Sequence, residues 1–343
     1  MKSTFFMTVF ATFLGFSANA ETTVPFKSPL PVTPDNFTRA ESDLYFHNLA
    51  KDGSFESFVH KREPSPIDEQ LVIRLNRDTL YSSLLIDLDA GPVTVTLPDA
   101  GNRFISLQVI NEDQYTRTVE YKPGDYTFSK DDIGTRYALF GIRILVNPED
   151  EKDLKEVHAL QDALKFKQEK KGSFEVPVWD SESQNKIRKA LLELGTTLPD
   201  TKGTFGWKDQ VDPVRFLIGS AMAWGGNPEK DALYLNITPH ENDGKIIHKL
   251  TVKDVPVDGF WSISLYNPEG YYVANKYNAY SLNNLTAKKD KDGLTTIQFG
   301  GCDGKVPNCL PIMKGWNYMV RLYRPHEEIL NGTWKFPEAV PVK

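Results

Sequence analysis

Apolar and polar residues alternate along much of the chain between residues 70 and 147. Val93, Val95 and Leu97 are separated by threonines, and residues 138–146 continue the same pattern over a longer run. A period of two is typical of strands that bury one face. Turn sequences such as DAGP and KPGD separate the runs. This region therefore predicts an antiparallel β-sandwich.

On both sides of that region, apolar residues recur with the helical period of 3.6 residues. Residues 33–53 predict a helix in which Thr33 is the cap and Gly53 the end. Three more helices are expected at residues 154–164, at residues 187–194 and after Pro213. The last of these has almost no polar face, which predicts a buried helix.

Strand patterns resume after Gly225-Gly226. The runs are ALYLNIT, KIIHKLTVKD, FWSISLY, LTTIQF and YMVRLYR. The order of sheet, helices and sheet predicts a mainly β protein in three parts. These are an N-terminal helix plus sandwich at residues 21–147, a helical middle segment at 148–226 and a second β-region at 227–343.

The first 20 residues have the features of a secretory signal peptide. Lys2 precedes an apolar run, and Ala18 and Ala20 suit signal peptidase. No later segment is long and apolar enough to span a bilayer. We therefore expect an exported protein, periplasmic or secreted, with no transmembrane anchor after cleavage of residues 1–20.

Charge and motifs exclude several classes of function. The formal net charge is −6, so a basic surface for nucleic acid is not expected. The chain has no phosphate loop, no dinucleotide fingerprint, no zinc-protease helix and no G-x-S-x-G elbow. We expect neither a cofactor nor a metal. The oligomeric state is left open.

The chain has two cysteines, Cys302 and Cys309, with turn residues between them. In an exported protein such a pair favours a disulfide. A loop this short contributes roughly 2.5 kcal/mol by the chain-entropy relation, so it holds a loop and not the fold. The alternative, a zinc site, would need further ligands that the neighbouring sequence does not supply.

The most unusual feature is the polar tripeptide Asn76-Arg77-Asp78 between two alternating runs, residues 70–76 and 79–88. As a site, Arg77 would clamp an anion, Asp78 would act as a base and Tyr81 would stack or donate. As a structural feature, Arg77 and Asp78 would form an ion pair at a sheet end. We expect Arg77 to be held by an acidic residue, Asp78 to accept from backbone or tyrosine, and a pocket within reach of both.

Four further residues join Asn76 as candidates for ligand binding. Asn111 and Asp113 end a neighbouring predicted strand and are expected to form the opposite wall of the pocket. Trp261 and Tyr266, in the aromatic stretch FWSISLYNPEGYY, have the chemistry of a sugar or lipid groove. The alternative for these two aromatic residues is an ordinary place in the core.

Three stretches of the chain resemble a known family. VTPDNFTRAESDLYF, REPSPIDEQLVIRLNRDTLYSSLLIDLDAGPVTVTLPDAG and NYMVRLYRPHEEILNGTWKFP are similar to exported proteins that pair domain of unknown function 1254 with domain of unknown function 1214. The resemblance implies an immunoglobulin-like sandwich, a helical segment and a jelly-roll-like sandwich, in that order. It also implies that many relatives have a histidine where this chain has Gln114. An activity that needs that histidine would be missing here.

Two functions fit these observations. The first is a hydrolase or lyase acting on a small ester or glycan, with its site between the two sandwiches, where pockets concentrate. The second is a non-catalytic, envelope-associated protein that binds a small molecule or glycan. The absence of a recognisable nucleophile and base favours the second function, and the polar tripeptide favours the first.

Overall fold

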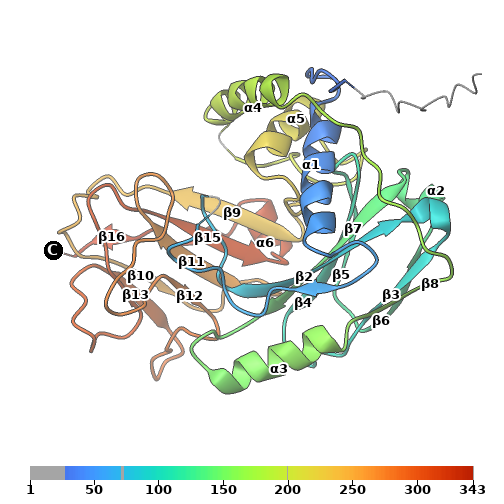
Figure 1. Cartoon of the computed structure of the whole chain (residues 1–343). Helices are drawn as coiled ribbons and strands as arrows, with labels where there is room; N and C mark the ends of the chain where they lie inside the picture. Colours follow the sequence, from blue (N-terminus) through green and yellow to red (C-terminus); the bar gives the residue numbers. More distant parts are fainter. Residues whose placement is uncertain (1–27, 71–72, 199, 343) are drawn as a thin grey trace, which may run out of the picture.

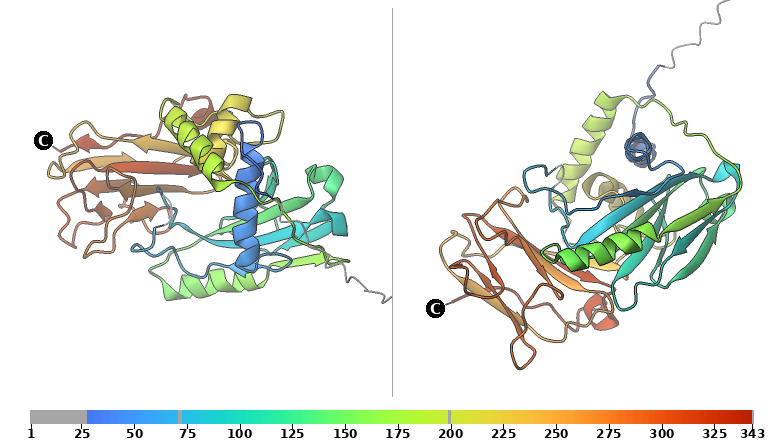
Figure 2. Two further views of the ribbon diagram at one scale, coloured as in Figure 1. Left: turned by 45° about the horizontal axis from the view of Figure 1, so that its top comes forward. Right: turned by 60° about the horizontal axis from the view of Figure 1, so that its bottom comes forward.

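The computed structural model describes residues 28–70, 73–198 and 200–342. The predicted signal peptide lies outside these residues. Within them the chain is mainly β, with 16 strands in four sheets (Figure 1). Figures 1 and 2 show the N-terminal and C-terminal sheets side by side, with two helices of the middle segment above their junction.

Two antiparallel sheets form the N-terminal part. The larger has the order β1 (Val59–His60), β2 (Thr79–Asp87), β7 (Tyr137–Leu145), β4 (Ile105–Asn111) and β5 (Thr116–Glu120), and the smaller has the order β6 (Gly124–Phe128), β3 (Val93–Leu97) and β8 (Lys165–Gln168). Their facing sides share one core, in which Leu84, Val95 and Phe140 are fully buried. The strands predicted from alternation are confirmed.

Helices cover the larger N-terminal sheet. Its outer face packs against α1 (Phe37–Lys51), whose Phe46 contacts Leu85 and Ile110. α4 (Ser181–Gly195) and α5 (Pro213–Met222) pack against α1 in turn, and α3 (Glu151–Asp162) closes the core between the two sheets. Three short helices complete the set: η1 (Leu88–Ala90), α2 (Lys130–Ile133) and α6 (Glu327–Leu330).

The helices differ from the sequence prediction in two details. α1 begins at Phe37 and not near Thr33, because the Asn36 side chain accepts the Thr33 N–H and holds a turn before the helix. α5 is buried on one side only: Phe216 and Ile218 are covered, whereas Val214 is 67% exposed. Apolar residues all round a helix therefore do not bury it when only one side has neighbours.

Two more sheets form the C-terminal part. One has the order β14 (Cys309–Leu310), β13 (Thr295–Phe299), β10 (His248–Val252) and β16 (Val340–Pro341), and the other has the order β12 (Ser281–Asn283), β11 (Trp261–Tyr266), β15 (Asn317–Tyr323) and β9 (Ala232–Ile237). All strand pairs are antiparallel except β13 with β14. Ile263, Phe299 and Trp316 lie in the core between the two sheets. The five strands predicted in this region are confirmed.

β11 and β15 are buried on both faces. One face carries Ile263 and Val320 into the core between the C-terminal sheets. The other face carries Ser262, Ser264 and Arg321, which are also buried. This second, polar face is covered by the N-terminal part of the chain, because Arg321 donates hydrogen bonds to the backbone of residues 74 and 75.

The strand expected at residues 70–76 is wrong for the described residues. Residues 73 and 74 form a turn, and β2 begins at Thr79. Ile73 is 52% exposed, whereas Leu75 packs against Tyr266 and Tyr272 of the C-terminal part. Leu75 therefore packs into the other half of the molecule and does not belong to a strand.

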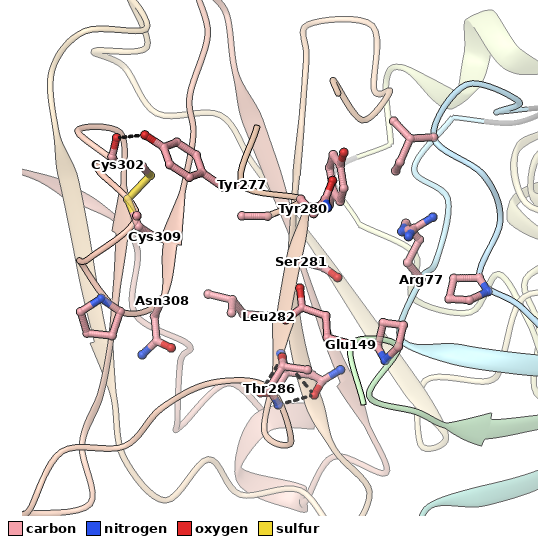
Figure 3. Close-up of a pocket in the computed structure, with 18 of the residues that line it drawn as sticks. Arg77, Glu149, Tyr277, Tyr280, Ser281, Leu282, Thr286, Cys302, Asn308 and Cys309 are labelled. Carbon is pink, nitrogen blue, oxygen red and sulfur yellow. Dashed lines mark hydrogen bonds between the residues drawn. A yellow bond between two sulfur atoms is a disulfide. The ribbon is translucent and has the colours of Figure 1, made fainter. Parts of the chain in front are cut away.

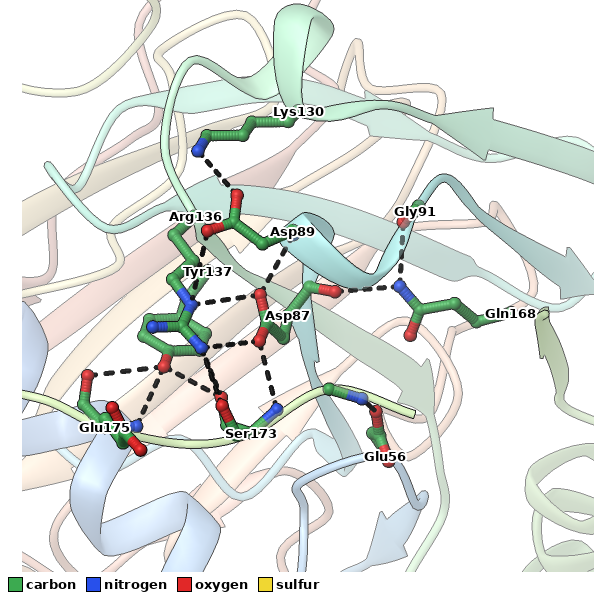
Figure 4. Close-up of polar contacts among 11 residues, drawn as sticks. Glu56, Asp87, Asp89, Gly91, Lys130, Arg136, Tyr137, Gln168, Ser173 and Glu175 are labelled. Carbon is green, nitrogen blue, oxygen red and sulfur yellow. Dashed lines mark hydrogen bonds and ion pairs between the residues drawn. The ribbon is translucent and has the colours of Figure 1, made fainter. Parts of the chain in front are cut away.

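A polar cluster around Asp87 ties the chain that follows β8 to the end of β2 (Figure 4). The Asp87 carboxylate accepts from Nη2 of Arg136 at 2.8 Å, from Nε of the same residue at 3.1 Å and from the backbone of Ser173 at 3.1 Å. The Arg136 guanidinium lies 4.8 Å from the centre of the Tyr137 ring. Burial alone would raise the pKa of Asp87, but the hydrogen bonds from Arg136 and Ser173 lower it.

Asp87→Asn keeps the shape of the side chain and removes its charge. We expect the free energy of unfolding at pH 7 to fall by about 1–3 kcal/mol, because charge-assisted hydrogen bonds are lost. A carboxyl group whose pKa is lowered on folding stabilises the fold above its unfolded pKa of about 4, and that stabilisation is lost as the pH falls through the folded value. Urea denaturation should therefore show that the difference in the free energy of unfolding between the wild type and Asp87→Asn becomes smaller at acidic pH.

Asp89→Asn is the matched control, since Asp89 is more exposed, pairs with Lys130 at the surface and lies 3.6 Å from Nε of the same Arg136. Its effect should stay within about 0.5 kcal/mol. Equal effects of the two substitutions would contradict a special role for Asp87.

Candidate functional site

A buried arginine joins the two halves of the molecule. Arg321, on β15, is 2% exposed. Its Nη2 atom donates to the carbonyl oxygens of Arg74 at 2.8 Å and Leu75 at 3.2 Å, and to Oη of Tyr266 at 2.8 Å. Its Nη1 atom donates to Oγ of Ser264 at 2.7 Å. Because a guanidinium has only donors, these acceptors hold residues 74 and 75 against the C-terminal sheet.

Asp78 enters the same buried space. It is 1% exposed, and its Oδ1 atom accepts from the Asn283 amide at 3.2 Å. Burial raises the pKa of Asp78, while the nearby positive charge of Arg321 opposes the rise. The expected donors, backbone or tyrosine, are thus replaced by an asparagine. The cation that influences this carboxyl group most is Arg321 and not Arg77.

Arg77 points away from Asp78 and into a groove (Figure 3). Its Nη1 atom donates to the carbonyl oxygen of Ser65, and its guanidinium lies 5.5 Å from the centre of the Tyr280 ring. Within the described residues, it forms no ion pair with a carboxylate. The prediction that an acidic residue holds Arg77 is therefore wrong. The alternative, an ion pair between Arg77 and Asp78, is not observed among the described residues either.

The groove runs between the two halves of the chain and has a volume of about 770 Å³. Figure 3 shows Arg77 and Glu149 on one side, the Cys302–Cys309 bridge on the other and Tyr280 between them. The wall combines two tyrosine rings, charged groups and amides. They are Glu63, Asp68, Arg77, Glu149, Tyr277, Asn278, Tyr280, Asn283, Lys288 and Asn308. Arg77 therefore reaches the expected pocket. Asp78 does not, because it lies behind Asn283, which lines the groove.

The predicted disulfide between Cys302 and Cys309 is confirmed. Both cysteines line the groove. Oη of Tyr277 donates to the carbonyl oxygen of Cys302 at 2.6 Å, so the bridge and this ring hold one wall together. A covalent link across a short loop restricts the loop and thereby preorganises that wall.

Asn76 and Tyr81 face a different space from Arg77. The Asn76 amide donates to Oη of Tyr81 at 3.0 Å and Oη of Tyr323 at 3.1 Å. The Tyr81 ring lies 5.6 Å from the guanidinium of Arg143. Neither Asn76 nor Tyr81 is among the residues that line the groove. The three consecutive residues of the tripeptide thus enter three separate environments.

The expectation that Asn111 and Asp113 form the opposite wall is wrong. In the register of the sheet, Asn111 is opposite Ala138, which pairs with Ile86 near the far end of β2. Seven residues of strand separate Ile86 from Thr79, a distance of about 23 Å. Asn111 holds its own turn by accepting from two backbone N–H groups.

Trp261 and Tyr266 also lie outside the groove. Trp261 is in the C-terminal core, 6.2 Å from Phe336 between ring centres. Tyr266 lies at the junction, where its Oη atom donates to the carbonyl oxygen of Leu75 at 2.8 Å. Successive residues of a strand face opposite sides, and this separates Trp261 from the polar face of the same strand.

A second polar cluster surrounds Asp113. Arg39 of α1 donates to Asp113 at 2.5 Å and lies 3.8 Å from Glu112. Asp43, on the same helix, accepts from the indole of Trp179 at 2.8 Å. Burial and the neighbouring Glu112 raise the pKa of Asp43 to about 7, while the Trp179 hydrogen bond and Arg39 oppose the rise.

Gln114 lies in the same turn as Asp113, with a positive φ of 67°. Its side chain is buried, and neither its amide nitrogen nor its amide oxygen has a hydrogen-bond partner within the described residues. An amide buried in this way is costly.

Two further features concern metal binding and membrane insertion. In residues 28–70, 73–198 and 200–342, no group of three or more histidine, cysteine, aspartate or glutamate side chains is placed to hold a metal ion. None of the helices in the described part of the chain has the length and apolar character needed to cross a membrane.

Sequence reasoning missed four residues that matter at the junction. Tyr277 and Tyr280 lie in a region without a regular pattern, so nothing marked them. Arg143 and Arg321 did carry a signal, since each interrupts an apolar strand, IRIL and VRLY. A charge inside a strand that is otherwise apolar needs polar partners. Arg321 finds two of them in the backbone carbonyls of residues 74 and 75, and Arg143 donates to Gln108 and Asn227.

Two family models match the chain. "Protein of unknown function (DUF1254)" covers residues 55–168, and "DUF1214", likewise described as of unknown function, covers residues 235–327. The residues that line the groove all belong to the two matched regions, so the groove lies between these regions.

Two solved structures have a similar fold. The VPA0106 protein from Vibrio parahaemolyticus is 19% identical, with a TM-score of 0.68 over 90% of this chain and 98% of that one. A putative uncharacterized protein from Burkholderia cenocepacia is 11% identical, with a TM-score of 0.51 over 90% and 87%. A comparison with curated proteins finds no match.

Arg321→Lys tests the buried junction. A lysine ammonium has three donors on a flexible stem and does not reproduce the planar fork that reaches two carbonyls and two hydroxyls. We expect the free energy of unfolding in urea to fall by about 3–5 kcal/mol. Arg324→Lys, in an exposed pair with Asp258, should change it by less than about 0.5 kcal/mol. A stable Arg321→Lys protein would show that these hydrogen bonds do not hold the junction.

Asp43→Asn tests the raised pKa. Since Asp43 binds a proton more tightly in the folded state, its contribution to the free energy of unfolding falls as the pH rises from about 4 to 7. The asparagine does not titrate, so between pH 5 and pH 8 its stability should rise relative to the wild type by on the order of 1–3 kcal/mol. Asp113→Asn, which removes the charge of a more exposed neighbour, is the control. Parallel stability curves for wild type and Asp43→Asn would contradict the assignment.

Proposed function

We propose that this chain, which belongs to the proteins that pair a DUF1254 with a DUF1214 domain, is an exported, envelope-associated binding protein whose groove takes a small polar ligand of the glycan type. The observation that carries the proposal is the position of Arg77. Its guanidinium lies over Tyr280 in a groove that also presents Tyr277 and several amide side chains. The arginine of the tripeptide is thereby available to a ligand.

The composition of the groove supports a glycan. Sugar rings offer C–H faces that pack on aromatic rings, and hydroxyl groups that both donate and accept. Tyr277 and Tyr280 supply the rings, and Asn278 and Asn283 supply both donors and acceptors. A volume of about 770 Å³ is within the range of small-molecule sites.

Two observations support export. The disulfide between Cys302 and Cys309 is the kind of bond that persists in an oxidising compartment. The first 20 residues have the pattern of a signal peptide, as the sequence predicts. We also propose that the N-terminal half is an immunoglobulin-like sandwich and that the C-terminal half is a jelly-roll-like sandwich.

A hydrolase or lyase acting on a small ester or glycan is the second candidate. One observation favours it: Asp78 is a buried carboxyl group whose pKa is raised by burial, although Arg321 and hydrogen bonds from Ser262 and Asn283 oppose the rise. A carboxyl group of this kind suits a general acid. Asp78 lies behind Asn283 and is not among the groove residues, so catalysis would require Asn283 to move.

A thermal-shift screen of the exported protein against neutral and acidic glycans, lipids and small acids tests the binding proposal. A ligand that binds the native state raises the melting temperature in proportion to RT ln(1 + [L]/Kd). For a glycan that binds, Arg77→Ala should weaken the affinity by about tenfold, because a charge-assisted contact is lost. Product formed on incubation would identify an enzyme, and Asp78→Asn would then abolish turnover and leave affinity unchanged.

Arg117→Ala is the matched control. Arg117 also donates to a backbone carbonyl, that of Asp132, and its guanidinium lies 5.3 Å from the Trp207 ring centre, outside the groove. Its removal should leave the affinity unchanged. A ligand that binds wild type, Arg77→Ala and Arg117→Ala equally would place binding elsewhere and remove the proposal.

A further inference from the structure

A second cluster of polar side chains lies on the other side of residue 76 from the groove. Tyr81 of β2 and Arg143 of β7 are directly opposite each other on the outer face of the larger N-terminal sheet. Tyr234 of β9 and Tyr323 of β15 approach from the C-terminal part, and both influence the pKa of Arg143. The cluster is thus completed only when both halves of the chain are present.

The amide of Asn76 has a defined orientation. Its Oδ1 atom accepts the backbone N–H of Asp78 at 2.8 Å, and a backbone N–H is only a donor. The Nδ2 atom must then face Tyr81 and Tyr323, whose Oη atoms accept its hydrogens. Each of these two hydroxyls therefore keeps its own hydrogen for another acceptor.

The amide of Asn227 has the same arrangement. Its Oδ1 atom accepts from Nη1 of Arg143 at 3.3 Å, and arginine is also only a donor. Its Nδ2 atom therefore faces Oη of Tyr234, at 3.2 Å. Within residues 28–70, 73–198 and 200–342, none of the hydroxyls of Tyr81, Tyr234 and Tyr323 donates a hydrogen bond.

Arg143 brings a positive charge without a carboxylate partner. Its Nη1 atom donates to Oε1 of Gln108 at 2.6 Å and to Asn227 at 3.3 Å, and the Tyr81 hydroxyl also contacts the guanidinium. No ion pair involves Arg143 in the described part of the chain. Burial would lower the pKa of Arg143, but the surrounding tyrosines raise it, so the guanidinium stays charged.

Tyr323 remains a donor at neutral pH. Burial raises the pKa of Tyr323 well above its ordinary value, and the neighbouring Tyr234 and Tyr81 add to this. Tyr81, Arg143 and Tyr234 are each partly exposed, so solvent reaches the cluster. Three tyrosine hydroxyls that accept but do not donate, and a guanidinium without a carboxylate partner, therefore lie close together in the described part of the chain.

We propose that Arg143, with the hydroxyls of Tyr81, Tyr234 and Tyr323, forms a binding site for a small oxygen anion, either the carboxylate of an organic acid or a phosphate. Both ligands are acceptors only, and both offer the oxygen pairs that a guanidinium binds through two parallel hydrogen bonds. The site is separate from the groove of Arg77. It spans the two halves of the chain, so its occupant would also strengthen their association.

Isothermal titration calorimetry of the full exported chain tests this site. Acetate, succinate and phosphate are titrated separately, each against a chloride solution of equal ionic strength. We expect saturable binding of at least one of them below about 10 mM, and no saturation by chloride. Saturation by succinate or acetate alone assigns a carboxylate, and saturation by phosphate alone assigns a phosphate.

Hydroxyl deletions locate the anion. Tyr234→Phe and Tyr81→Phe each remove one donor and keep the ring, and each should weaken the affinity by about tenfold. Tyr126→Phe is the matched control, because its hydroxyl donates to the carbonyl oxygen of Lys122 at the surface. Arg143→Lys should weaken binding further, and the phenylalanine variants keep the test decisive if Arg143→Lys does not fold.

Two results would overturn the proposal. One is the absence of saturable binding by all three anions. The other is an affinity that Tyr234→Phe and Tyr81→Phe leave unchanged. Arg77→Ala is included so that the two sites are distinguished: it should not alter anion binding, and a loss on this substitution would move the anion to the groove.

Discussion

The structure depends on satisfying one buried guanidinium. Arg321 lies in the middle of a C-terminal strand, on a face that water does not reach. Removing a charge from water costs several kcal/mol unless polar groups replace the lost hydration. The replacements are the carbonyl oxygens of Arg74 and Leu75, which belong to the other half of the molecule. The burial of Arg321 therefore requires a segment of the N-terminal part.

That requirement explains the polar tripeptide at residues 76–78. Residues 74 and 75 are held in place by Arg321, and the strand β2 begins only at Thr79. The chain between them directs Asn76 toward the tyrosines, Arg77 into the groove and Asp78 into the buried junction. Because this connection is not a regular strand and bends at Asp78, its three neighbouring side chains are not restricted to the two faces of a sheet and reach three different environments.

The regular elements were predictable from sequence, and the junction was not. Val93, Val95 and Leu97 alternate because one face is buried, and β3 follows directly from that pattern. Leu75 follows the same pattern, yet its apolar neighbours are Tyr266 and Tyr272, nearly 200 residues later in the chain. The alternation of apolar and polar residues indicates that one side of a segment is buried, but it does not indicate which part of the chain covers that side.

Only part of the candidate site was predictable for the same reason. Arg77 was recognised because a polar tripeptide between apolar runs is locally unusual. Asn111 was misplaced because the register of β4 against β7 decides which end of the sheet it reaches, and register depends on pairing between distant strands. Gln114 has a buried amide without a partner, which no local pattern indicates.

Each half of the molecule would lose contacts that stabilise it if the other half were absent. Without the N-terminal part, Arg321, Ser262 and Ser264 would be hydrated, at little cost, but the cluster formed by Tyr266, Tyr272 and Met319 would lose the cover of Leu75 and Ile67. Without the C-terminal part, residues 74–78 would have no partner that fixes their course. The apolar contact of Phe104 with Phe260, 5.0 Å apart between ring centres, would be lost from both sides. We therefore expect the two matched regions to unfold together, because the groove and the tyrosine cluster are built from residues of both.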